Sequence, residues 1–212
     1  MMLSLGVFVS GRGSNLQALF AAIESKRLDA RIVLVLSNKA EAGGLALARE
    51  YGVPALHLAA GQFPSEVEYS RHLAALLTEH GVDFIVLAGY LQKIPSALIR
   101  QFHHRILNIH PALLPAFGGK GMYGHHVHEA VLDYGCKVSG VTVHLVDDDY
   151  DHGAPVLQQC VPVREDDTAT SLAARVLEVE HEILPRAVQL FASGRIRIAG
   201  RRVTILEEKD II

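Results

Sequence analysis

The chain has 212 residues, half of them hydrophobic, with 20 basic and 23 acidic side chains. This length suffices for one well-buried core, and we expect a single domain over residues 1–212. Basic and acidic residues are nearly equal in number, whereas nucleic-acid-binding proteins typically have an excess of basic residues. No nucleic-acid partner is therefore expected. The apolar start, residues 3–10, is too short to span a membrane and has no basic leader, so we expect a first strand and no membrane partner.

The two cysteines, Cys136 and Cys160, lie far apart in the sequence and form no paired CxxC motif. Two such residues in a chain of this length do not indicate a disulfide framework. We therefore expect a protein of the reducing cytoplasm. Separately, we expect it to act as a monomer or a homodimer.

Short β-branched runs alternate with longer segments of helical periodicity along the first two thirds of the chain. In chain order we expect strand 3–9, helix 15–25, strand 31–36, helices 44–51 and 65–80, strand 84–87, helix 95–102, strand 105–109 and helix 126–134. Neighbouring parallel strands must be joined by crossover connections, usually helices. An alternation of strands and helices along the chain is therefore typical of a parallel sheet. The prediction is an α/β fold: a doubly wound, Rossmann-like, mostly parallel sheet with helices on both faces.

Beyond Gly140 the alternation of short strands with helices no longer continues. Two longer strands, 141–146 and 156–163, are separated by an acidic loop and followed by a long helix over 168–192, which predicts a mixed edge to the sheet. Residues 196–205 alternate apolar with basic or small side chains, and we expect a terminal hairpin with Gly200 near its turn.

A glycine-rich turn, Ser10-Gly11-Arg12-Gly13-Ser14-Asn15, joins the first strand to the first helix. The free N–H groups and the dipole of a helix start can hold a phosphate. A dinucleotide motif would need a third glycine where Leu16 stands and an acid near Ser37, so a monophosphate fits better than NAD. The alternative is an ordinary turn in which Ser14 is the N-cap.

The loop of residues 88–95 follows the strand 84–87, at the end of the sheet where ligands of α/β proteins bind. Gly89 allows a close backbone approach, and Tyr90 offers an amphipathic ring, so a flat heterocycle could lie there. The alternative is a plain connection in which Pro95 starts the next helix.

Asn108 and His110 lie at the end of the strand 105–109. Side chains alternate along a strand, so these two point to the same side and can converge on one substrate atom. An amide beside an imidazole suits acyl or formyl transfer, because the amide can stabilise an oxyanion while the imidazole moves a proton. The alternative for a histidine at a strand end is a capping or surface role.

The run Asp147-Asp148-Asp149-Tyr150-Asp151-His152-Gly153 carries four carboxylates directly after another strand. One of them could orient His110 and raise its pKa, although a solvated loop would have the same composition. Spacing alone does not say which carboxylate it would be. The three histidines 125, 126 and 128 lack an accompanying Cys or Glu array of zinc-site spacing, so no metal is expected.

Six segments of the chain together resemble the folate-dependent phosphoribosylglycinamide formyltransferases. They are SGRGSNLQAL, SNKAEAGGLALA, LAGYLQKIP, LNIHPALLPAF, GVTVHLVDDDYDHGAPVLQ and EHEILPRAVQLFASG. The resemblance spans nearly the whole chain. It is specific because LNIHPxLLP and GxTVHxVxxxxDxGxPxxQ occur in the order and separation found in that family.

By that resemblance Asn108 and His110 are the catalytic amide and imidazole, and Asp151 is the carboxylate that raises the pKa of His110. The resemblance also implies a ribotide site and a folate site. The ribotide residues would be Gly13, Ser14 and Asn15 at the phosphate and Glu180 at the ribose. The folate residues would be Leu91, Gln92, Lys93, Ile94, Asn108, Asp147, Asp148, Asp149, Tyr150 and Asp151.

The implied reaction is attack by the amine of glycinamide ribonucleotide on the formyl carbon of 10-formyltetrahydrofolate, the co-substrate, in de novo purine biosynthesis. Three features depart from the family pattern: Gln92 and Glu66 stand where basic residues are common, and Gly118 follows Phe117 where proline is usual. We expect the loop of residues 118–124 to be mobile.

Other functions remain open at the level of sequence. A formyltetrahydrofolate hydrolase or a methionyl-tRNA formyltransferase would be expected to carry an additional domain, for which 212 residues leave no room. A non-catalytic folate or nucleotide binder could keep the same fold, since fold does not fix function. A nicotinamide dehydrogenase is disfavoured by the incomplete glycine motif.

Overall fold

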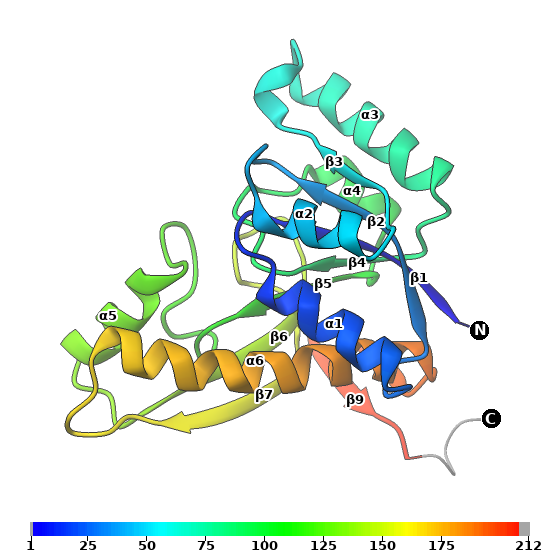
Figure 1. Cartoon of the computed structure of the whole chain (residues 1–212). Helices are drawn as coiled ribbons and strands as arrows, with labels where there is room; N and C mark the ends of the chain where they lie inside the picture. Colours follow the sequence, from blue (N-terminus) through cyan, green and yellow to red (C-terminus); the bar gives the residue numbers. More distant parts are fainter. Residues whose placement is uncertain (1, 208–212) are drawn as a thin grey trace.

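The computed structural model describes residues 2–207 and contains a central seven-stranded sheet flanked by helices (Figure 1). The strands lie side by side in the order β3-β2-β1-β4-β5-β6-β7. Their bounds are β1 Leu3–Val9, β2 Ala30–Ser37, β3 Ala55–His57, β4 Phe84–Leu87, β5 Ile106–His110, β6 Val138–Leu145 and β7 Pro155–Pro162. The first five strands in sequence pair in parallel, whereas β6 is antiparallel to both β5 and β7.

This topology confirms the predicted doubly wound architecture and its mixed edge. The chain runs outward from β1 through β2 to β3 and then returns to place β4 on the other side of β1. The reversal creates a crevice at the carboxyl ends of β1 and β4, which is where α/β sheets bind ligands. Strand β3 is not among the strands expected from the sequence, because a strand of three residues with two exposed side chains carries no clear periodicity.

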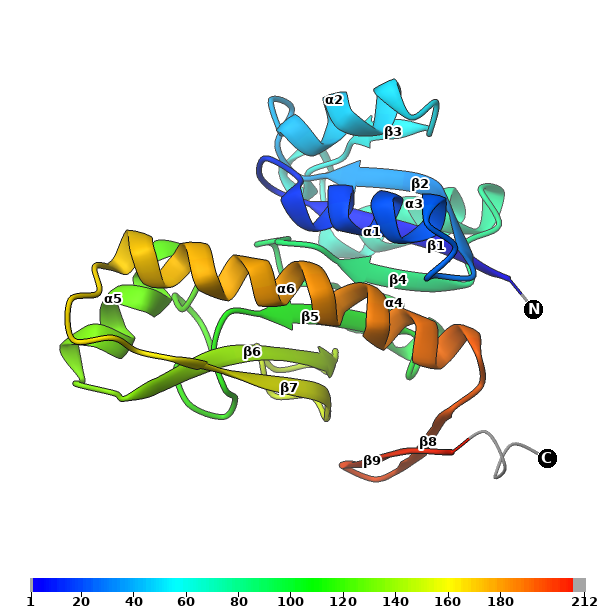
Figure 2. The same ribbon diagram turned by 60° about the horizontal axis from the view of Figure 1, so that its bottom comes forward.

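Helices cover both faces of the sheet (Figures 1 and 2). Their bounds are α1 Ser14–Glu24, α2 Gly43–Glu50, α3 Glu66–Glu79, α4 Ser96–Gln101, α5 His125–Asp133 and α6 Ala169–Ala192, with a 3-10 turn at Ala60–Gln62. Alternate residues of β1 show the two faces: Leu5 and Val7 belong to the core cluster under α1, α2 and α6, whereas Phe8 belongs to the cluster under α3 and α4. Because side chains alternate along each strand, the two faces of the sheet contribute to two separate hydrophobic cores.

Helix α1 begins after a left-handed glycine rather than after a side-chain cap. Gly13 is the N-cap residue with φ of 88°, and no side chain bonds to the first turn. A Cβ at Gly13 would lie 2.7 Å from the Cα of Gly44, at the start of α2. The N-cap role considered for Ser14 is therefore wrong: Ser14 is the first residue of the helix itself. The free N–H groups of this turn stay available to a ligand.

The end of the described chain forms the predicted hairpin, with β8 at Ile196–Ala199 and β9 at Arg202–Ile205. Its residues Ile196, Ile198 and Val203 pack against the core cluster beneath α6. Figure 2 shows the hairpin below β6 and β7. Within residues 2–207, no helix is both long and apolar enough to cross a membrane.

Candidate active site

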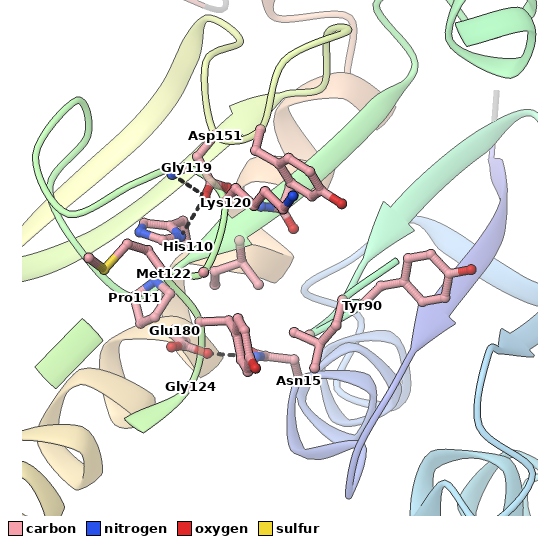
Figure 3. Close-up of a pocket in the computed structure, with 17 residues that line it drawn as sticks. Asn15, Tyr90, His110, Pro111, Gly119, Lys120, Met122, Gly124, Asp151 and Glu180 are labelled. Carbon is pink, nitrogen blue, oxygen red and sulfur yellow. Dashed lines mark hydrogen bonds and ion pairs between the residues drawn. The ribbon is translucent and has the colours of Figure 1, made fainter. Parts of the chain in front are cut away.

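Three adjoining cavities follow the carboxyl ends of β1, β4 and β5. The central one has a volume of about 420 Å³ and is lined by the ends of these strands, by residues 119–124 and by α6 (Figure 3). A second cavity shares Tyr90, Asn108, Tyr150 and Asp151 with it. A third shares Asn15, Gly89, Pro111, Gly124 and Glu180 with it. A substrate with two chemically different ends could therefore span the central cavity.

The three residues implied as catalytic meet in the central cavity. Asn108 and His110 come from β5, as the alternation along that strand predicts, and Asp151 comes from the loop after β6. The Nδ1 atom of His110 lies 3.5 Å from Oδ2 of Asp151, with side-chain exposures of 4% and 11%. Asp151 Oδ2 also accepts the backbone N–H of Gly119 at 2.9 Å. The convergence expected for these side chains is present in the geometry.

The amide of Asn108 is oriented by a buried histidine on the neighbouring strand. Asn108 Nδ2 lies 3.0 Å from Nε2 of His144 and 3.4 Å from Oδ1 of Asp151. The Nδ1 of His144 lies 2.8 Å from the Leu145 carbonyl oxygen, which only accepts, so neutral His144 carries its proton on Nδ1 and accepts from Asn108 through Nε2. Both N–H groups of the amide thus have an acceptor.

The imidazole of His110 has a defined tautomer for the same reason. Its Nε2 lies 2.8 Å from the carbonyl oxygen of Phe117 and must donate to it. Neutral His110 therefore turns an unprotonated Nδ1 toward Asp151. The contact with Asp151 becomes an ion pair only when Nδ1 takes up a second proton.

The charge of Asp151 raises the pKa of His110, as expected from the sequence, but burial has the larger and opposite effect. Burial lowers the pKa of His110 below its ordinary value, and the charge of Asp151 and the bond to Phe117 offset only part of that effect. Desolvation is larger because the side chain is 4% exposed. Asp151 stays ionised: burial raises its pKa, but contacts from His144, His110 and the Gly119 amide hold it below the usual value.

The third cavity collects groups that suit a phosphorylated sugar. Asn15 Nδ2 donates to Oε2 of Glu180 at 2.6 Å, and both residues are more than nine-tenths buried. Burial raises the pKa of Glu180, partly offset by the bond from Asn15. Asn15 Oδ1 is buried without a hydrogen-bond partner, so it can accept a hydrogen bond from a bound ligand.

Two helix starts converge on this same cavity. Its lining includes Gly13 and Ser14 at the start of α1, Gly124 and His125 at the start of α5, and Arg12 between them. The N-cap residues Gly13 and Gly124 provide no side-chain cap, so both first turns keep free N–H groups. Uncapped helix starts beside a guanidinium form an anion-binding environment.

The second cavity, of about 70 Å³, contains most of the residues implied for the folate. Gln92, Lys93 and Ile94 line it from the loop after β4, opposite Asp147 and Asp149. Leu91 lies at the central cavity instead, and Asp148 is exposed and lines none of these three cavities.

Tyr90, which lines both the central and the second cavity, is paired with the buried Tyr69. The hydroxyls of Tyr69 and Tyr90 lie 3.3 Å apart, and burial raises the pKa of both phenols. For Tyr69, the contact with Tyr90 and then that with the Gln92 side chain offset only part of the rise in its pKa. Glu66, the other residue that departs from the family pattern, is exposed at the start of α3.

His144 and residues 119–124, which line the central cavity, are site residues that were not expected from the sequence. His144 faces Asn108 directly in the antiparallel register of β5 and β6. The sequence indicates that His144 and Thr142 point to the same side of their strand, but it does not indicate that His144 pairs with Asn108. As for metals, the described residues 2–207 contain no group of three or more His, Cys, Asp or Glu arranged to hold one.

Comparison with known proteins agrees with this geometry. Residues 4–188 match the formyl transferase family model. This chain belongs to the formyl transferase family. It is 43% identical over 207 residues to the chloroplastic phosphoribosylglycinamide formyltransferase of Arabidopsis thaliana, covering 97% of this chain and 71% of the relative. The Escherichia coli enzyme of the same name is 37% identical, with 92% and 90% covered.

Solved structures show the same fold. A crystal structure of glycinamide ribonucleotide transformylase 1 from Symbiobacterium toebii superposes with a TM-score of 0.91 at 44% identity, covering 97% of this chain and 95% of that one. The predicted family, fold and enzyme class, a transferase, are thereby confirmed. Formyl transfer in purine biosynthesis is the activity that these relatives support.

Proposed function

We propose that this chain transfers the formyl group of 10-formyltetrahydrofolate to the amine of glycinamide ribonucleotide, giving formylglycinamide ribonucleotide and tetrahydrofolate. The observation that carries the proposal is the position of Asn108, His110 and Asp151 in the cavity that connects an anion-binding end with the loops implied for folate. The names of the Arabidopsis and Escherichia coli relatives support the same reaction.

In the proposed mechanism the substrate amine attacks the formyl carbon, and a tetrahedral intermediate forms with negative charge on the former formyl oxygen. Asn108 Nδ2 and protonated His110 stabilise that charge. The 3.4 Å contact from Asn108 to Asp151 is the longer of its two, so this N–H is the one that turns to the oxyanion. A water molecule carries the proton of the amine to the leaving folate nitrogen.

Asp151 acts on His110 through its charge. Burial favours the neutral imidazole, and the carboxylate 3.5 Å away opposes that effect. The developing oxyanion adds a second negative charge next to His110 and favours the imidazolium further. The protonated form is therefore stabilised when the intermediate needs it.

At the ribotide end we assign Gly13, Ser14 and Asn15 to the phosphate and Glu180 to the ribose. The free N–H groups of the first turn of α1 suit a phosphate. Asn15 contributes its backbone N–H to the phosphate, whereas its unpartnered side-chain Oδ1 lies next to Glu180 and accepts, as Glu180 does, from a ribose hydroxyl.

At the folate end we assign Leu91 to Ile94 and Asp147 to Asp151. A flat heterocycle fits between these two loops, where the Lys93 ammonium lies 5.9 Å from the centre of the Tyr150 ring. Gln92, next to Tyr69, and the exposed Glu66 are the two positions at which the family resemblance implies basic residues instead. Both cysteines are free, which suits a reducing compartment such as the cytoplasm.

Two other functions of the same fold compete, namely a formyltetrahydrofolate hydrolase and a binder without activity. The test is an absorbance assay for the folate product with purified protein and 10-formyltetrahydrofolate, with and without glycinamide ribonucleotide. Product that needs the ribotide and is lost in His110→Ala supports the transferase. Product without the ribotide identifies a hydrolase, and no product in either case contradicts the proposed function.

A further inference from the structure

The turn of the terminal hairpin contacts the loop that carries Asp151. Arg201, between β8 and β9, donates from Nη2 to the carbonyl oxygen of His152 at 2.6 Å. Its Nη1 lies 3.3 Å from Nε2 of the same imidazole. The guanidinium therefore holds the residue that directly follows Asp151 in the chain.

Two further contacts lie within the acidic loop, in addition to those that the Asp151 carboxylate makes with Gly119 and Asn108. Asp147 Oδ2 lies 2.7 Å from Nδ1 of His152, and Asp147 Oδ1 accepts the backbone N–H of Asp149. Asp151 itself has φ of 52°, a left-handed conformation that is unfavourable for a residue with a side chain. Such a conformation persists only when neighbouring contacts hold it.

The far end of the loop cannot adjust freely. A Cβ at Gly153 would lie 1.7 Å from the carbonyl oxygen of Leu145, so the backbone is pressed against the end of β6 there. Behind Asp151 lies a cavity of about 280 Å³, whose lining includes Gly118, Gly153 and Arg201. The loop that carries Asp151 therefore has space to shift toward the cavity that Arg201 lines.

The hairpin is a firm base for this contact. Its strands pair over four residues each, and its apolar side chains Ile196, Ile198 and Val203 pack against the main core. Arg195 and Leu206 join its open end through their backbones. The turn is thus held in place independently of the acidic loop.

We propose that Arg201 is a positioning residue that fixes the carboxylate of Asp151 against His110. The effect of Arg201 on turnover rests on the proposed function, whereas its effect on the position of Asp151 does not. Ion pairs and hydrogen bonds at an exposed surface stabilise a fold little, so the contact matters for placement rather than for stability. A displacement of about 1 Å at a catalytic group can cost about a hundredfold in rate.

The test compares Arg201→Ala with Arg202→Ala, a neighbouring exposed arginine of the same hairpin. Arg201→Ala is expected to lower kcat by about tenfold to a hundredfold, with an unchanged KM for the ribotide and an unchanged melting temperature. Arg201→Lys should recover part of the loss, because an ammonium can also donate to the His152 carbonyl. His152→Ala keeps that carbonyl and should retain more activity than Arg201→Ala.

A second readout does not need the reaction. The charged or titratable groups that act on His110 are Asp151 and His144 beside β5 and His128 on α5. In Arg201→Ala the carboxylate moves away, so the pKa of His110, followed by NMR of 15N-labelled imidazoles, should fall further. An unchanged pKa and a kcat within twofold of the parent would overturn the positioning role. A shifted pKa in a protein that never formylates the ribotide would instead contradict only the proposed function.

Discussion

His110 and Asp151 are arranged so that their attraction depends on the protonation of His110. The Nε2–H of His110 is committed to the Phe117 carbonyl, and Nδ1 faces the carboxylate at 3.5 Å. With Nδ1 unprotonated, the two groups present lone pairs to each other. With Nδ1 protonated, they form a nearly buried ion pair, which is worth more than one at the surface.

This arrangement makes the pH dependence of Asp151→Asn informative. Burial already lowers the pKa of His110, and the charge of Asp151 is the largest opposing effect. Loss of that charge should lower the pKa further, so that the protonated form is lost at a lower pH. The limb of the kcat profile on which activity falls with rising pH should move to lower pH, together with a lower maximum. A profile that keeps its position would contradict the role of Asp151.

Asn108→Ala tests the proposed oxyanion contact. Removing a single oxyanion donor typically costs on the order of a hundredfold to a thousandfold in turnover. We expect a loss of that size in kcat and little change in KM for either substrate, measured by steady-state kinetics. Asn108→Asp is the matched variant, because it keeps the shape and replaces the donor by a charge that repels the oxyanion. Activity close to that of the parent in either variant would remove Asn108 from the mechanism.

The central pair of the site could be predicted from the sequence because it depends on local geometry alone. The period of two in a strand places Asn108 and His110 on one side whatever the rest of the fold does. The carboxylate could not be chosen in this way, since Asp151 lies in an irregular loop and has a positive φ. The family resemblance selected it, and the contacts to His110 and Gly119 agree with that choice.

The features that could not be predicted from the sequence depend on tertiary pairing and on burial. His144 became a neighbour of Asn108 only through the antiparallel register of β5 and β6. The raising effect of Asp151 on the pKa of His110 could be expected from the sequence, but the larger lowering effect of burial could not, because the depth of burial is set by the tertiary structure. The short β3 and the N-cap at Gly13 were likewise determined by neighbouring elements.

Glu180→Gln tests the ribotide end of the site. Glu180 is 9% exposed and accepts from Asn15 at 2.6 Å. The amide keeps the shape but accepts less strongly and brings a donor toward the Asn15 amide nitrogen. We expect KM for the ribotide to rise about tenfold, the equivalent of a lost hydrogen bond to a charged group, while the folate KM stays unchanged. Equal changes in both KM values would argue for a general distortion of the cavity.

Gly13→Ala tests the turn that precedes α1. Its φ of 88° is unfavourable for alanine, and the new Cβ would lie 2.7 Å from the backbone of Gly44. Gly52→Ala is the matched control, because Gly52 has φ of 69° and a Cβ added there would have no neighbouring atom within 4 Å. We expect Gly52→Ala to cost about 1 kcal/mol in the free energy of unfolding and Gly13→Ala to cost more, as measured by urea denaturation. Equal losses would show that α1 and α2 can separate without cost.

His128 provides a prediction for the dependence of stability on pH. It is 4% exposed, its Nδ1 has no hydrogen-bond partner, and burial, followed by the nearby His125 and His110, lowers its pKa to about 4. The unfolded chain binds a proton at this position near the ordinary value of 6.5, so it holds more protons than the folded chain between those two values. Stability contributed by neutral His128 is therefore present above pH 6.5 and is lost as the pH falls to about 4.

A shift of this size corresponds to a loss on the order of 3 kcal/mol in the free energy of unfolding. We expect His128→Gln to lose less unfolding free energy than the parent between pH 7 and pH 4.5, by urea denaturation at both values. His126→Gln is the control, because that side chain is 62% exposed and should behave as the parent does. The lowered pKa of His181 and the raised pKa of Glu180 are shared by all the variants and cancel in the comparison. Identical pH dependence of His128→Gln and the parent would mean that His128 has the same pKa in the folded and the unfolded protein, and would contradict this prediction.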